Sequence, residues 1–132
     1  MEKENVSLSE AEWKVMEELW KRESATGREL TERLEQRCGW NRSTTLALLR
    51  RMEAKGAVES VQNGPVKAFR PLLRREDAAL RETESFLSRV YHGSLSMMVS
   101  TLSRQQALSQ QEIDELYALL KEAEVKKNDR DD

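Results

Sequence analysis

The chain has 132 residues, one cysteine, one histidine and a net charge of −2. Such a chain folds as one ordinary domain or two small ones, with a modest core and no room for a large catalytic scaffold. The single cysteine excludes an intramolecular disulfide, and one Cys with one His cannot build a zinc or copper site. No apolar run approaches a membrane span, and MEKENVSLSEAEW lacks the features of a signal peptide. We therefore expect a cytoplasmic protein without membrane insertion.

The charge is distributed unevenly along the chain. Residues 40–75 carry 8 Lys and Arg against 2 Asp and Glu, whereas residues 1–39 carry 7 against 10 and residues 76–132 carry 7 against 12. Because salt limits the reach of a charge to about 8 Å, a partner responds to local charge more than to net charge. The middle of the chain is therefore the part that we expect to meet an anionic partner.

Three segments carry the capping-box signature of a helix start. Each has a Ser or Thr followed three residues later by Glu, and these side chains can pair with the first free backbone N–H groups of a helix. The segments begin at Ser9, Thr26 and Ser109, and apolar residues at helical spacing follow each of them. They predict helices that start directly after these three residues.

The stretch NRSTTLALLRRMEAKG, residues 41–56, predicts a further helix with Asn41 as its N-cap and Gly56 beyond its end. One face of this helix is apolar, and the opposite face holds no acid. Arginines there suit phosphates, hydroxyls can bond to bases or phosphates, and small apolar side chains can contact thymine methyl groups. We therefore predict that DNA is contacted by Arg42, Ser43, Thr44, Leu46, Ala47, Arg50 and Arg51.

The segments AVESVQ and VKAFRP flank an Asn-Gly-Pro turn at residues 63–65 and predict a β-hairpin that ends at Pro71. Three helices followed by a hairpin is the order of a winged helix-turn-helix domain, which we assign to residues 1–73. Lys67 and Arg70 extend its basic surface, and Lys67 is predicted to contact DNA. Alternatively, this fold serves as a protein-interaction module without specific DNA binding, but the absence of acids in residues 36–52 favours DNA.

From residue 74 onward, apolar residues recur at helical spacing, with a break at His92-Gly93. Three short helices cannot bury so many large apolar side chains alone, which predicts a homodimer. We assign residues 74–125 to a helical dimerisation domain and the polar residues 126–132 to a disordered tail. The fold class is thus mainly α with a small β-hairpin. The predicted dimer interface consists of Phe86, Leu87, Val90, Tyr91, Leu95, Met98, Val99, Leu102, Ile113, Leu116 and Leu120.

No catalytic site can be assembled from the sequence. His92 is the only histidine, and no nucleophile with a fitting base can be placed around it. We therefore predict that the chain is not an enzyme and that it needs no metal or cofactor. Four carboxylates of the first helix are expected on its solvated surface: Glu10, Glu12, Glu17 and Glu18.

Four segments of the chain, taken in order, resemble the penicillinase and methicillin-resistance repressor family (BlaI/MecI type). The family's opening helix is similar to LSEAEWKVMEELWK, its recognition helix to STTLALLRRMEAKGAV, its dimerisation segment to FLSRVYHGSLSMMV and its final helix to LSQQEIDELYALL. The resemblance implies a homodimeric transcriptional repressor that binds a dyad-symmetric double-stranded DNA operator. It also implies release by proteolysis in the dimerisation region, after a signal from a membrane-bound sensor protease, and a link to antibiotic resistance.

Within the recognition helix, the resemblance matches Thr44 and Arg51 to family positions. Leu46 and Ala47 stand where other members carry polar residues that read bases, so the resemblance does not predict this operator's sequence.

Two further sites depart from the family pattern. The wing tip has Gly-Pro at residues 64–65 where the family often has Gly-Arg, which leaves Lys67 as the nearby cation. The family's scissile Asn-Phe bond aligns with Thr101-Leu102, which is therefore the candidate cleavage site.

Overall fold

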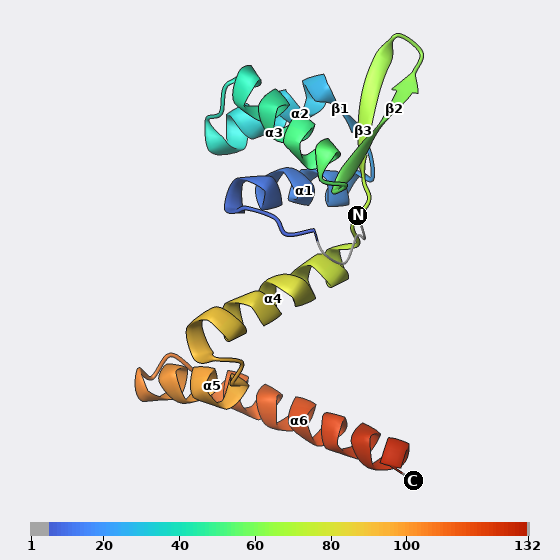
Figure 1. Ribbon diagram of the computed structural model, residues 1–132. Coiled ribbons are helices and arrows are strands. Elements are labelled where there is room, and N and C mark those ends of the chain that lie inside the picture. Colours follow the sequence, from blue (N-terminus) through green and yellow to red (C-terminus); the bar gives the residue numbers. More distant parts are fainter. Residues whose placement is uncertain (1–5, 132) are drawn as a thin grey trace. The chain divides into compact units, whose positions relative to one another are not determined.

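The computed structural model describes residues 6–131, and the chain divides into two compact units, one ending at Thr83 and one beginning at Glu84 (Figure 1). The division lies inside a helix, later than the boundary after residue 73 that the sequence suggests. One reason is that Ala78, near the start of this helix, is buried in the first unit.

The first unit contains the predicted helices and hairpin in the predicted order. Ser9 and Thr26 form complete capping boxes, and Asn41 Oδ1 accepts a hydrogen bond of 2.9 Å from the backbone N–H of Thr44. The local signals for the starts of the three helices in this unit are therefore confirmed. The elements are α1 (Glu10–Arg22), β1 (Ala25–Thr26), α2 (Gly27–Cys38), α3 (Arg42–Ala54), β2 (Val58–Asn63) and β3 (Val66–Pro71).

The hairpin belongs to a three-stranded antiparallel sheet with the order β1-β3-β2. Strand β1 was not predicted, because two residues are too few to show an alternating pattern. Its Ala25 pairs with Phe69 of β3, which joins the loop before α2 to the wing. At the wing tip Gly64 has φ 68°, and the ring of Pro65 holds its own φ near −65°, so the two-residue turn meets the type II′ requirement.

The core of the first unit lies between the three helices and the base of the sheet. The predicted apolar face of α3 is buried, with Thr45 and Met52 both 0% exposed. Burying one large apolar side chain contributes about 1.5–3 kcal/mol, so this core holds α3 firmly against α1 and α2. The most deeply buried large apolar side chains are Val15, Met16, Leu19, Leu30, Leu34, Leu49, Met52 and Val58.

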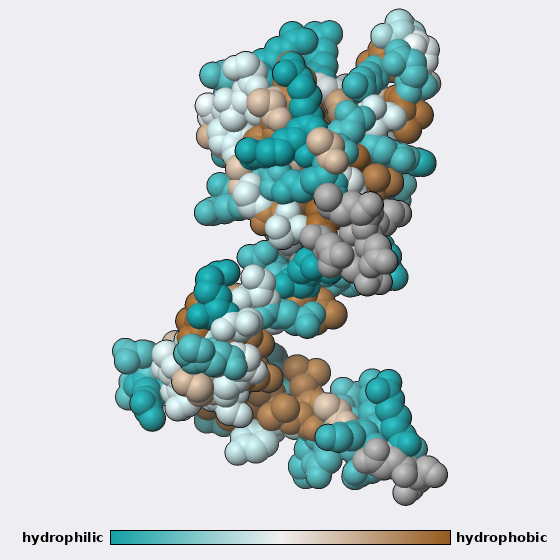
Figure 2. Space-filling view, viewed as in Figure 1, coloured by the Kyte–Doolittle hydropathy of each residue, from teal (hydrophilic) through white to brown (hydrophobic). Residues whose placement is uncertain are grey.

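The second unit is helical and leaves its apolar side chains uncovered. The predicted break occurs at His92 and Gly93, which have φ 52° and 85°. None of the side chains described between residues 84 and 130 is buried. Figure 2 shows apolar side chains gathered on the surface over α5 and α6. The helices that contribute to this unit are α4 (Arg75–Tyr91), α5 (Leu95–Arg104) and α6 (Gln110–Asp131).

The prediction of a disordered tail is wrong for residues 126–131, because α6 continues to Asp131. This segment has no Pro or Gly, and its two lysines are good helix formers that extend a helix already nucleated upstream. Within residues 6–131, no helix combines the length and the apolar character that a membrane span requires.

Candidate nucleic-acid interface

The N-terminal turn of α3 presents a polar surface around Asn41. Its Oδ1 accepts hydrogen bonds from the hydroxyls of Ser43 and Thr44 at 2.9 and 3.0 Å, besides the capping bond. Arg42, Ser43 and Thr44 are all exposed. The turn therefore offers hydroxyls, a guanidinium and the positive end of a helix dipole to solvent, a combination that suits an anion.

Three basic side chains of α3 and the wing form no ion pair among the side chains that the structure describes: Arg42 and Arg50 of α3, and Lys67 of β3. Lys67 Nζ lies 5.6 Å from the centroid of the Phe69 ring, close enough for a cation–π contact. Arg70, by contrast, forms an ion pair with Glu59 on the neighbouring strand. Arg70 therefore adds less positive charge to the wing than the sequence suggested.

An open depression of about 200 Å³ lies where α3 meets the wing. Arg50 and Lys67 both line it, so the recognition helix and the wing contribute cations to the same place. Glu53 lines it too, and its carboxylate accepts a hydrogen bond from the Ser60 hydroxyl. Leu46 also lines it and is half-buried, whereas Ala47 is exposed. A Cβ on Gly27 would lie 3.8 Å from Leu46 and 3.7 Å from Phe69. Less of Leu46 is thus available to a base than the helical pattern predicted.

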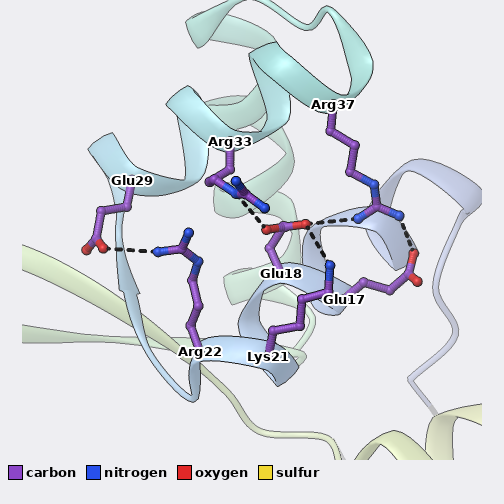
Figure 3. Close-up of polar contacts among 7 residues, drawn as sticks. All are labelled: Glu17, Glu18, Lys21, Arg22, Glu29, Arg33 and Arg37. Atoms are coloured by element: carbon purple, nitrogen blue, oxygen red, sulfur yellow. Dashed lines mark hydrogen bonds and ion pairs between the residues drawn. The ribbon is translucent and has the colours of Figure 1, made fainter.

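The prediction that the carboxylates of the first helix lie on its solvated surface is wrong for Glu12 and Glu18, which are each 1% exposed. Glu18 is surrounded by Arg37, Arg33 and Lys21 at 3.0, 3.4 and 3.8 Å (Figure 3). Burial opposes its ionisation, but the hydrogen bond from Arg33 and the charge of Lys21 outweigh burial and lower the pKa of Glu18. This cluster ties α1 to α2.

Glu12 links α1 to the last turn of α3. Its Oε1 accepts hydrogen bonds from Lys55 Nζ at 2.7 Å and from the backbone N–H of Ser9 at 2.8 Å. Its Oε2 forms an ion pair with Arg51 Nε at 3.4 Å. Arg51, which the sequence assigned to DNA, therefore has an acidic neighbour on another helix, although 61% of its side chain is exposed.

The residues predicted for dimerisation lie in the second unit and remain accessible in the single chain. Six of them are half-buried, and the other five, Phe86, Val90, Leu95, Leu102 and Leu120, are 37–60% exposed. The half-buried ones are Leu87, Tyr91, Met98, Val99, Ile113 and Leu116.

The candidate cleavage bond, Thr101-Leu102, lies in the last turns of α5, where the Thr101 hydroxyl donates a hydrogen bond of 3.0 Å to the Met97 carbonyl. A protease that requires an extended substrate would have to unwind this part of the helix. Among the residues that the structure describes, no group of His, Cys, Asp and Glu could hold a metal ion.

Three helices followed by a hairpin, with an exposed basic face on the third helix, define a winged helix-turn-helix regulator. The family model of the penicillinase repressor matches residues 8–122, and the chain belongs to this family. The family consists of repressors, so the chain is not an enzyme, as the sequence predicted.

Relatives and solved structures agree with this assignment. The penicillinase repressor of Bacillus licheniformis is 33% identical over 122 residues, which cover 92% of this chain and 95% of the relative. The methicillin resistance regulatory protein MecI of Staphylococcus aureus is 26% identical over 120 residues, covering 91% and 98%. The B. licheniformis BlaI monomeric form in complex with the blaP half-operator matches with a TM-score of 0.51 and 29% identity, over 55% of this chain and 88% of that one.

Proposed function

We propose that this chain is a homodimeric transcriptional repressor that binds a dyad-symmetric operator through α3 and the wing. The observation that carries the proposal is the exposed part of α3, where Arg42 and Arg50 form no ion pair among the described side chains and Lys67 of the wing lines the same depression as Arg50. The relative that was solved on a half-operator supports the same use of the domain.

The contacts divide by chemistry. Arg42, Arg50 and Lys67 bind backbone phosphates, since guanidinium and ammonium groups supply most phosphate contacts. Ser43, Thr44 and Ala47 face base edges in the major groove, where hydroxyls bond to donors and acceptors and a methyl group contacts thymine. Leu46 contributes only through the part of its side chain that the core leaves uncovered.

Homodimerisation rests on the uncovered apolar side chains of the second unit. Leu95 and Leu120 are 52% and 60% exposed, values that a single chain in water does not favour for large aliphatic residues in such number. A second copy would cover them and bring two winged helices to one DNA. Half-sites should then lie one helical turn apart, about 10 bp, or a multiple of it.

The test is fluorescence anisotropy of the purified protein on a labelled fragment of its own upstream DNA, with a scrambled duplex as control and a salt series for both. Operator binding predicts preference for the upstream fragment and an affinity that falls steeply with salt, by about 0.9 in log–log slope per phosphate contact. Weak binding without preference would reject the proposal and favour the protein-interaction module.

Release of the repressor is the second part of the proposal. A signal from a membrane-bound sensor protease leads to cleavage of Thr101-Leu102 in the cytoplasm, which separates α6 from the rest of the second unit. Mass spectrometry of the protein recovered from cells before and after a β-lactam challenge tests this. Fragments ending at Thr101 support it, whereas an intact chain during full derepression contradicts it.

A further inference from the structure

Two carboxylates of α1 are equally buried but face different helices. Glu18 and Glu12 are each 1% exposed. Glu18 faces arginines of α2, as Figure 3 shows, whereas Glu12 faces the last turn of the recognition helix. Burial of a charge is therefore unfavourable for both residues, but Glu18 forms ion pairs with α2 and Glu12 forms them with the end of α3.

The Glu12 contacts leave one oxygen for Arg51. Oε1 is occupied by Lys55 and by the backbone of Ser9. Lys55 in turn donates a hydrogen bond of 2.8 Å to the Ser7 carbonyl. Oε2 is buried and receives no hydrogen bond from the described residues, so the Arg51 Nε at 3.4 Å is its only recorded contact. A buried carboxylate oxygen without a donor is costly, which favours keeping Arg51 nearby.

The contact with Glu12 orients Arg51 but leaves its guanidinium accessible to DNA. The contact with Glu12 is made at Nε, while a guanidinium has five N–H donors, and 61% of the Arg51 side chain remains exposed. Its Nη groups are thus free for a phosphate. The group of Glu12, Arg51 and Lys55 keeps a net charge of +1, so it still attracts DNA.

We propose that Glu12 is a positioning residue for DNA binding, which fixes the Arg51 guanidinium so that its outer edge meets a backbone phosphate. The inference rests on the proposed operator binding. An arginine whose Nε is drawn toward a carboxylate by an ion pair can present its two Nη groups as a planar pair of donors to phosphate, and less of its side-chain freedom is lost on binding.

The decisive variant is Glu12→Gln, which keeps the size of the side chain and an acceptor for Ser9 but removes the charge that holds Arg51. We expect its operator affinity to fall about tenfold per half-site, which is the effect of losing one charge-assisted hydrogen bond from Arg51 to a DNA phosphate. Long-range electrostatics alone predicts the opposite sign, because a negative charge near DNA has been removed. The matched control is Glu18→Gln, equally buried on the same helix, which should bind as the wild type does.

A double-mutant cycle tests the route through Arg51. The Glu12→Gln and Arg51→Ala pair should bind no more weakly than Arg51→Ala alone, because the positioned group is already absent. Additive losses would overturn the proposal, as would equal affinities of Glu12→Gln and Glu18→Gln.

Two further measurements distinguish failure to fold, failure of this proposal and failure of the proposed function. If Glu12→Gln does not fold, Arg51→Lys replaces it, since it keeps the charge and Glu12 but loses the planar fork. The proposal then expects weaker operator binding, and wild-type affinity would overturn it. Wild-type protein without preference for the operator would reject the proposed function itself, an outcome distinct from all of these.

Discussion

The indole N–H of Trp20 donates a hydrogen bond of 2.9 Å to the backbone carbonyl oxygen of Leu73. The bond joins the last turn of α1 to the segment that follows the wing. The Trp13 ring meets the Trp20 ring edge-on at 5.2 Å between centroids, and Leu73 is buried. The first unit is therefore closed by a contact between its first helix and the chain that leaves its sheet.

Trp20→Phe should lower the free energy of unfolding by about 1–3 kcal/mol, because the Leu73 carbonyl loses its donor in a partly buried place. Urea unfolding followed by circular dichroism measures this. Trp13→Phe is the control, since no hydrogen bond of its indole is recorded among the described residues, and it should cost less. Equal losses in the two variants would show that the hydrogen bond contributes little.

Ala47→Asp should abolish operator binding. Ala47 is exposed on α3, which carries no acid from Arg42 to Met52, and a carboxylate there would repel the phosphate backbone and leave a buried charge in the complex. Ser88→Asp adds the same charge on an exposed position of α4 and should keep nearly wild-type affinity. Anisotropy on the same duplex compares them, and binding by Ala47→Asp at wild-type strength would reject α3 as the recognition helix.

Val90→Arg should convert the dimer to a monomer. Val90 is 46% exposed in the single chain, and a guanidinium there would be buried without a partner in a dimer. Sedimentation velocity should give half the wild-type mass, with a matching loss of affinity for the two-half-site operator. Ser88→Arg, two residues earlier on the same helix, is the control and should stay dimeric. A dimeric Val90→Arg would exclude this face from the interface.

Stability should depend on pH through Glu18. Its pKa in the folded chain lies below the ordinary value of 4.5, because cations outweigh burial. The unfolded chain therefore takes up the proton first, so the stabilisation is complete well above pH 4.5 and is lost as the pH falls below it. Urea unfolding between pH 7 and pH 3 should show a smaller acid-dependent loss for Glu18→Gln. Parallel curves for the two proteins would mean that other groups govern the decline.

Glu23→Gly should stabilise the first unit. Glu23 ends α1 with φ 68°, a positive value that strains a residue with a Cβ by about 1 kcal/mol and that strains glycine less, because glycine has no Cβ. The melting temperature should rise by about 4–8 °C for a unit of this size. Gly56→Ala makes the reverse change at φ 84°, where a Cβ would have open space, and should lower it. A fall in melting temperature for Glu23→Gly would show that its side chain contributes more than the strain costs.

The sequence predicted the features that depend on neighbours in the chain. Side-chain caps such as Asn41 act within three residues, and the Gly-Pro turn specifies its own geometry, so both can be found from local patterns. The periodicity of α3 likewise separated its buried face from its exposed one, because both follow from 3.6 residues per turn.

The features that the sequence missed depend on residues far apart in the chain. Strand β1 exists only because Ala25 meets Phe69 of β3. Glu12 can be buried because Lys55, which lies 43 residues later in the chain, supplies a counter-charge. Hydrophobic periodicity assigns a glutamate to the exposed face because it is polar, and it contains no information about a distant counter-charge. The same limit applies to Leu46, whose half-burial is set by Gly27 and Phe69.

The two buried glutamates of α1 are also expected to couple the unfolding of the three helices of the first unit. If α3 separated from α1, Glu12 would lose its ion pairs with Lys55 and Arg51. If α2 separated from α1, Glu18 would lose its ion pairs with Arg33 and Arg37. Either event breaks these ion pairs and hydrogen bonds together with the apolar packing between the helices. Partial opening of one helix therefore costs contacts of α1 as well as its own. The recognition helix is thus prevented from fraying independently, and the surface that it shows to DNA is kept in one conformation until the whole unit melts.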